Sequence, residues 1–154
     1  MKKLTLSGFT LVELLVVIGI LAILLAITLI AINPARQFSQ SNNAKRSSDV
    51  NAVLNAINQY MADNKGLLPP GTWSSTAQTI ASTAWNAFCT TLAPQYIAAL
   101  PSDPLSNNGT PVTATDCSGT GSWTTNYTVA TTTNNRLTVA APSAEIGATI
   151  NVTR

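Results

Sequence analysis

Few residues in this sequence have side chains that commonly carry out catalysis. The chain contains no histidine, which excludes the commonest general base, the Ser–His and Cys–His nucleophilic pairs and imidazole metal ligands. Its two cysteines, Cys89 and Cys117, form no C-x-x-C motif. We therefore expect neither an enzyme nor a bound cofactor.

A group of oxygen-bearing side chains in the C-terminal half has the chemistry, but not the spacing, of a calcium site. Asp103, Asn107, Asn108 and Asp116 carry the kind of oxygen ligand that calcium prefers. They do not follow the spacing of an EF-hand loop. We interpret Asp103 and Asp116 as solvated loop residues and only weak calcium candidates, and we expect no metal site.

Glu13 lies where a carboxylate is costly. It falls within residues 9–32, which are otherwise nearly all Leu, Val, Ile, Ala and Gly, and about 20 such residues suffice to cross a bilayer. A cleaved secretory signal has a shorter apolar core, of about 7–15 residues, and an A-x-A-like cleavage site. A plain membrane anchor explains the length of the run but not Glu13, because a carboxylate near the centre of a membrane helix costs roughly 2.5–3.5 kcal/mol, and less near its end. The third interpretation is that Glu13 is functional, which is the default for a charge inside a membrane segment.

The N-terminal residues carry a family resemblance. The stretch KLTLSG followed by FTLVELLVVIGILAIL resembles the class III signal peptide of type IV pilins and of the pseudopilins of type II secretion. The resemblance implies that residues 1–8 are a cytoplasmic leader. It also implies that a prepilin peptidase/methyltransferase cuts between Gly8 and Phe9 and methylates the new amine of Phe9. Residues 9–32 then remain as a transmembrane and assembly helix.

The same resemblance gives Glu13 a partner, the methylated amine of Phe9 in a neighbouring subunit. An ammonium about 4 Å away would attract the carboxylate by about 4 kcal/mol at an effective dielectric constant of about 20. The pair would also set register, because a subunit displaced by one turn would leave both charges unpaired.

Residues 33–65 are predicted to continue the helix as an amphipathic segment. Asn33-Pro34 either ends one helix or kinks a longer one, and Gly66 is a stop signal. Between them, an apolar stripe recurs at helical spacing. The stripe consists of Val50, Val53, Leu54, Ile57 and Met61.

Residues 66–154 are predicted to form a globular head. Its first part, up to residue 108, has the composition of an irregular connection with a short helix that carries Ile80, Trp85, Phe88 and Leu92. The segments SWTTNYTVATT, RLTVAAP and EIGATINVT are rich in Thr, Val and other strand-forming residues. The predicted fold is therefore α+β and pilin-like, with a long N-terminal helix packed on a small antiparallel sheet of three or four strands.

Whether the two cysteines form a disulfide depends on the compartment in which they lie. In an exported head, Cys89 and Cys117 predict one disulfide, whereas in the cytosol they would be unrelated thiols. The export implied by the resemblance favours the disulfide, which would be worth roughly 3–4 kcal/mol for a loop of this length.

We expect a structural subunit of a type IV pilus-like filament. Its partners would be other copies of itself in a helical homopolymer, the prepilin peptidase, an inner-membrane assembly platform and, before assembly, the lipid bilayer. The precursor would be a single-pass inner-membrane protein with its head outside the cytoplasm, and the product an extracellular or periplasmic filament. A pseudopilin of a type II secretion or competence (DNA uptake) system is the alternative within the family. A membrane-tethered binding module that forms no filament is the alternative of another class.

Nucleic acid is the least supported partner. The formal net charge is only +2, and DNA-binding surfaces depend on clustered cations. Lys65, Arg136 and Arg154 are scattered along the chain, so we interpret them as surface charges.

Overall fold

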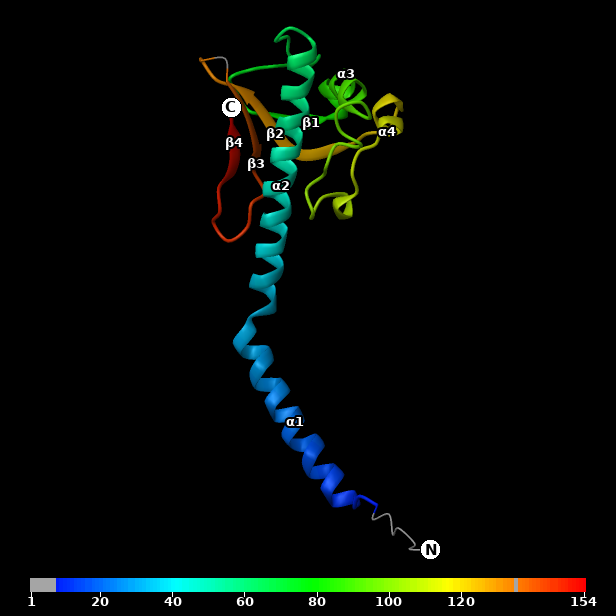
Figure 1. The fold of residues 1–154 in the computed structure, drawn as a ribbon, viewed down its shortest axis with the longest axis vertical. Helices are drawn as coiled ribbons and strands as arrows, with labels where there is room; N and C mark the ends of the chain where they lie inside the picture. Colours follow the sequence, from blue (N-terminus) through cyan, green and yellow to red (C-terminus); the bar gives the residue numbers. More distant parts are fainter. Residues whose placement is uncertain (1–7, 135) are drawn as a thin grey trace, which may run out of the picture. The chain divides into compact units, whose positions relative to one another are not determined.

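The computed structural model describes residues 8–134 and 136–154. Most of the predicted leader, including Lys2 and Lys3, therefore lies outside the described residues. The chain divides into two compact units, Met1–Phe38 and Ser39–Arg154. In chain order the elements are α1 (Leu11–Ile32), α2 (Pro34–Asp63), β1 (Gln78–Ala81), α3 (Ser82–Leu92), η1 (Asn107–Gly109), α4 (Ala114–Ser118), β2 (Thr124–Thr131), β3 (Leu137–Ala141) and β4 (Ile150–Thr153) (Figure 1).

The boundary between α1 and α2 lies at Asn33, where the sequence left two outcomes open. Asn33 has a φ of 47°, a left-handed conformation that asparagine tolerates at the C-terminal end of a helix. Pro34 then occupies the first position of α2, where its missing N–H would have no helical partner anyway. One helix therefore ends at Ile32 and a second begins directly after Asn33.

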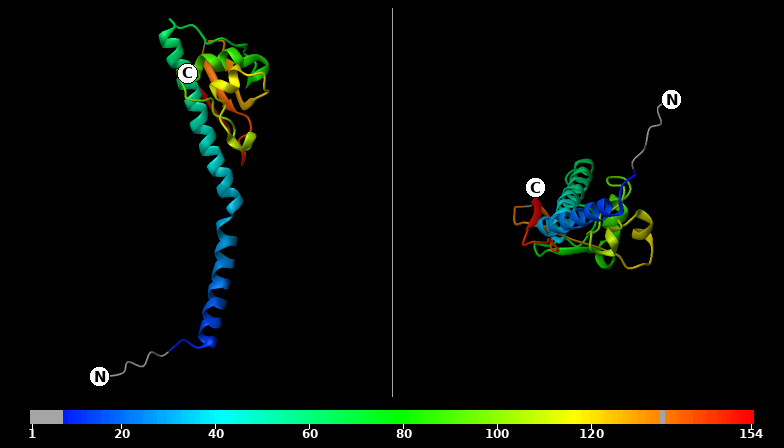
Figure 2. Two further views of the ribbon diagram at one scale, coloured as in Figure 1. Left: turned by 90° about the vertical axis from the view of Figure 1, so that its right-hand side faces the viewer. Right: turned by 90° about the horizontal axis from the view of Figure 1, so that it is seen from below.

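The second unit is built on a four-stranded antiparallel sheet in the order β1-β2-β3-β4. Two views show α2 running along one face of this sheet (Figures 1 and 2). Leu137, Val139 and Ala141 of β3 are buried, and the residues between them are partly exposed. This alternation is that of a sheet with one face in the core. The predicted α+β fold, with a helix on a small antiparallel sheet, is confirmed.

The apolar stripe of α2 forms one side of the core. Val50, Val53, Leu54 and Ile57 are each at most 1% exposed, and Met61 packs at the edge of the same cluster. Each such side chain contributes about 1.5–3 kcal/mol through its burial. The rest of the core comes from the sheet, α3, Cys117 of α4 and the loop residues Leu100 and Val112.

The sequence did not predict β1. Its four residues are too few to show a clear alternation, and α3 follows at once. Ile80 was expected on the helix, but it is the buried residue of this strand. The helix begins at Ser82, so the predicted short helix is present with a later start.

Candidate functional site

Glu13 caps the helix in which it lies. Thr10 is the N-cap of α1, and its Oγ1 accepts a hydrogen bond from the backbone N of Glu13 at 3.2 Å. In return, Glu13 Oε2 accepts hydrogen bonds from the backbone N and from Oγ1 of Thr10, both at 2.8 Å. This reciprocal pair is a capping box, which provides partners for backbone donors that a helix start leaves free. Within the described part of the chain, no group donates to Glu13 Oε1.

The surface of α1 is apolar and exposed. Its large apolar side chains are all at least half exposed, from 50% at Val16 to 84% at Ile30. The helix is long and apolar enough to cross a membrane. A surface of this kind requires cover by lipid or by other protein.

The predicted cleavage junction immediately precedes this helix. Gly8 and Phe9 lie before the first turn, and the Phe9 side chain is 85% exposed. The cut between them remains a prediction.

A second charged cluster lies inside the second unit. Arg46 of α2 is fully buried, and its Nε and Nη2 donate to the two carboxylate oxygens of Asp103 at 2.7 and 3.1 Å. Its Nη1 donates to Glu145 Oε2 at 2.7 Å and to Asn43 Oδ1 at 3.0 Å. The planar guanidinium suits such forked pairing. The hydrogen bonds to Asp103 are the main cause of a raised pKa for Arg46, so this buried group stays charged.

Glu145 fixes the β3–β4 connection to α2. Ser39 and Asn42 each donate to its carboxylate at 2.9 Å. The side chain of Asn43 binds the backbone of Glu145, donating to its carbonyl at 2.8 Å and accepting from its amide at 2.9 Å. The bonds from Arg46, Asn42 and Ser39 lower the pKa of Glu145. Four polar residues of α2, at the i, i+3, i+4 and i+7 spacing of one helix face, therefore hold one loop residue.

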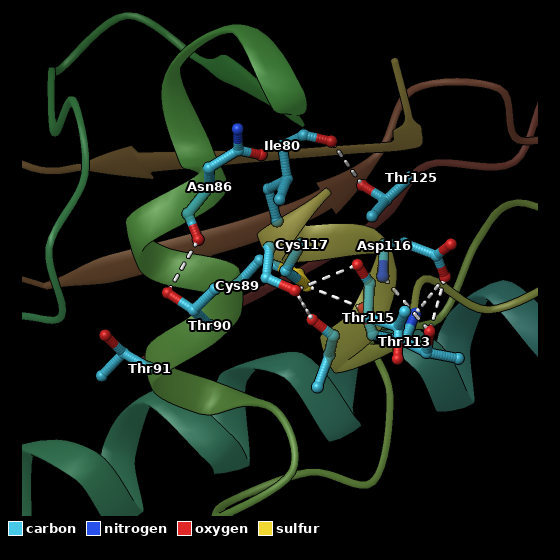
Figure 3. The surroundings of a disulfide bond; sticks show 12 residues. Ile80, Asn86, Cys89, Thr90, Thr91, Thr113, Thr115, Asp116, Cys117 and Thr125 are labelled. Carbon is cyan, nitrogen blue, oxygen red and sulfur yellow. Dashed lines mark hydrogen bonds between the residues drawn. A yellow bond between two sulfur atoms is a disulfide. The ribbon is translucent and has the colours of Figure 1, made fainter. Parts of the chain in front are cut away.

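The disulfide joins two helices beside the sheet. Cys89 of α3 and Cys117 of α4 are bonded, with their Cα atoms 5.5 Å apart (Figure 3). This is the pairing that the sequence predicted for an exported head. Thr113 and Asp116 form a second capping box at the start of α4, with Thr113 N and Oγ1 donating to Asp116 Oδ2 at 2.8 and 2.7 Å.

The two weak calcium candidates have separate structural roles. Asp103 is 1% exposed and is paired with Arg46, so its interpretation as a solvated loop residue is wrong. Asp116 is exposed and caps α4, and the bonds from Thr113 lower its pKa. Among residues 8–134 and 136–154, no group of three or more His, Cys, Asp or Glu side chains is arranged to hold a metal ion.

Sequence reasoning missed the roles of Arg46 and Thr10, although both left a signal. Arg46 precedes Val50 by four residues and Val53 by seven, so helical periodicity places it on the buried face of α2. Thr10-x-x-Glu13 directly before an apolar run is the sequence signature of a capping box.

The N-terminal residues also match a known family model. Residues 7–29 match the model of the prokaryotic N-terminal methylation motif. The N-terminus therefore resembles that of type IV pilin-like proteins. The match covers the Gly8–Phe9 junction, Glu13 and most of α1, and it points to a structural, membrane-anchored precursor that assembles with other pilins. The second unit, Ser39–Arg154, lies beyond the matched residues, and neither curated proteins nor solved structures gave a match to the chain.

Proposed function

We propose that this chain is the structural subunit of a type IV pilus-like filament. The observation that carries the proposal is an exposed apolar helix, within the methylation motif, whose carboxylate keeps one oxygen without a partner in the described part of its own chain. Lipid tails can cover such a helix, but they offer no partner for the carboxylate. Another copy of the processed chain offers both.

Processing creates the missing partner. A prepilin peptidase cuts between Gly8 and Phe9, and the amine freed on Phe9 is methylated and remains cationic. Because Thr10 of the same chain holds Glu13 Oε2 at 2.8 Å, the free Oε1 is the atom that receives the ammonium of a neighbouring subunit. The capping box orients the carboxylate before the neighbour arrives, which reduces the entropy lost on pairing.

Packing between the apolar helices then holds the filament. Lipid tails are as apolar as leucine, so hydrophobic transfer alone does not drive helices together in a membrane, and close packing and polar pairing decide the contact. Gly19, Ala22 and Ala26 give α1 small residues at which helices can approach closely. The inner-membrane assembly platform extracts subunits from the bilayer, and the Glu13–Phe9 pair sets their register.

Electron microscopy of material sheared from the cell surface, followed by mass spectrometry of its N-terminal peptide, tests this function. We expect abundant thin filaments whose subunits begin at N-methylated Phe9. An uncut chain that still begins at Met1 and stays in the membrane fraction would contradict the proposal. A processed chain that forms no filament would favour the membrane-tethered binding module.

A further inference from the structure

The turn between β3 and β4 carries an isoleucine in an unfavourable conformation. Ile146 has a φ of 58° and Gly147 a φ of 67°, and the amide of Ala148 donates to the carbonyl of Glu145 at 3.1 Å. Two central residues with positive φ are the pattern of a type I′ turn, in which Asn-Gly is strongly preferred. A β-branched residue with positive φ is a genuine outlier. The Ile146 side chain is nevertheless 52% exposed, so burial does not compensate for the strain.

The rest of the second unit holds this strained turn in place. Glu145, the residue before Ile146, is bound by Ser39, Asn42, Asn43 and Arg46 of α2. An asparagine at position 146 would connect β3 to β4 with less strain. Strain that is retained at an exposed site indicates a function, and an exposed aliphatic side chain on a rigid support suits a contact with another protein.

A depression that fits this side chain lies at the other end of the second unit. Its lining comes from Met61, Gly66, Leu68, Thr131 and Leu137, and its volume is about 190 Å³. An apolar cavity of about 150 Å³ already admits a benzene ring, so the four-carbon side chain of isoleucine fits. Figure 1 shows the end of α2 and the β2–β3 connection, which carry these residues, at one end of this unit and the β3–β4 turn at the opposite end.

The charges around the two features are complementary. Glu145, directly before Ile146, is the partly exposed carboxylate of a cluster whose other charges, Arg46 and Asp103, are buried and paired with each other, so the accessible charge beside Ile146 is negative. Beside the depression, the exposed cations Lys65 and Arg136 directly precede the lining residues Gly66 and Leu137 and outnumber the one exposed carboxylate there, that of Asp63. Opposite charges on facing surfaces steer association and suppress wrong registers.

We propose that Ile146 of one subunit inserts into the Met61–Leu68–Leu137 depression of the next copy of this chain. Along α2, residue 61 lies about 27 Å from residue 43, at 1.5 Å per residue, so the contact joins opposite ends of two copies. A heterologous contact generates a ring if its rotation closes and an open helical filament if it does not, and the proposed function requires the filament. The inference rests on the proposed filament function and adds a contact outside the α1 bundle.

The variant Ile146→Asn, in the full chain, separates this role from a structural one. It relieves the strain, so we expect thermal unfolding of the second unit at the wild-type temperature or about 3–6 °C above it. Tryptophan fluorescence reports this unfolding, because all three tryptophans lie in that unit. Filament yield should nevertheless fall at least about tenfold, the effect of losing one buried isoleucine at each contact. Leu105→Asn is the matched control, because Leu105 is a 67% exposed aliphatic on another loop, and it should leave the yield unchanged.

Cross-linking tests the pairing itself. In filaments of the double variant Ala148→Cys with Leu67→Cys, which keeps Ile146 and the lining of the depression and places both cysteines at exposed neighbouring positions, a short bis-maleimide should produce a ladder of multimers, whereas Leu105→Cys with Leu67→Cys should remain monomeric. Wild-type filament yield from Ile146→Asn, or no ladder from intact filaments of the first pair, would overturn this contact and leave the proposed function standing. If the wild-type chain formed no filaments, the proposed function would fail, and this contact with it.

Discussion

Two helices of this chain each carry a charge in an unusual place, and they treat it in opposite ways. In α1, Glu13 lies on an exposed apolar helix and shares one oxygen with Thr10, while its other oxygen has no partner in the described residues. In α2, Arg46 is completely buried, and two carboxylates and an asparagine surround its guanidinium. The carboxylate of Glu13 therefore lacks a full set of partners within the described chain, whereas the guanidinium of Arg46 has its partners within the second unit.

The difference separates assembly from folding. A buried charge must find its partners when the chain folds, because an unpaired charge in the interior is prohibitively costly. An exposed charge on an apolar helix can be paired after folding, by a group from another molecule. Changes at Arg46 should therefore alter unfolding, and changes at Glu13 should alter assembly and leave unfolding unaffected.

Removing the guanidinium of Arg46 should lower the unfolding free energy of the second unit. Arg46→Met leaves the buried carboxylate of Asp103 without a cation, and breaking a buried pair in this way costs about 3–5 kcal/mol of unfolding free energy. Urea denaturation followed by tryptophan fluorescence measures the loss. Arg36→Met is the control, because Arg36 is exposed, and it should change the midpoint little. Equal midpoints for the two variants would show that the cluster does not stabilise the fold.

Opening the disulfide should weaken the same unit from its other side. The double variant Cys89→Ser, Cys117→Ser frees α3 from α4, and we expect a loss of roughly 3–4 kcal/mol from the greater freedom of the unfolded chain. Adding a reductant to the wild-type chain should give a similar shift in the urea midpoint and no shift in the double variant. An unchanged midpoint in both experiments would show that the disulfide does not stabilise the second unit.

Gly71 and Gly19 differ in the space that surrounds them. A Cβ atom at Gly71 would lie 2.6 Å from Cζ3 of Trp85, whereas one at Gly19 of α1 would have no neighbour within 4 Å. Gly71→Ala should therefore cost about 1–3 kcal/mol by overpacking. Gly19→Ala should leave unfolding unchanged but reduce filament yield, because small residues allow helices to approach. If Gly71→Ala unfolded like the wild type, the second unit would be more loosely packed than described.

Acid should weaken the β3–β4 turn. The pKa of Glu145 lies below its ordinary value of 4.5 because Arg46, Asn42 and Ser39 donate to its charged form. A lowered pKa means that the unfolded chain binds the proton more readily, so this stability is present above about pH 4.5 and is lost as pH falls through the lowered value. The melting temperature, measured from about pH 6 to about pH 3, should fall less steeply in Glu145→Gln than in the wild type. Parallel curves would show that Glu145 does not contribute to the acid sensitivity.

Much of the fold could be predicted because its signals are periodic. The apolar stripe from Val50 to Met61 and the alternation from Leu137 to Ala141 each repeat with the period of their element. The start of the N-terminal helix was also predictable from Thr10-x-x-Glu13. In contrast, β1 was missed because four residues carry too little pattern beside a helix.

The polar contacts inside the second unit could not be predicted in the same way. Arg46, Asp103 and Glu145 are far apart in the sequence and meet only through the tertiary fold, so no local pattern connects them. The conformation of Ile146 is similarly hidden, because its sequence setting gives no reason to expect an isoleucine with positive φ. For Glu13, the neighbours along the chain identify the motif, but its proposed partner belongs to another molecule.

Comparing Glu13→Gln with Glu13→Ala separates the charge of Glu13 from its role in the helix cap. Glutamine keeps the capping box, because its side-chain oxygen can still accept from Thr10, but it carries no charge to meet the ammonium of Phe9. The measurement is the yield of sheared filaments for each variant, with mass spectrometry confirming a mature N-terminus at Phe9 and tryptophan fluorescence confirming the wild-type unfolding midpoint. We predict that both variants are processed and folded but that neither forms filaments in quantity. Wild-type filament yield from Glu13→Gln would show that Glu13 acts only as a helix cap, and would contradict the proposed pairing of its charge with the Phe9 ammonium of a neighbouring subunit.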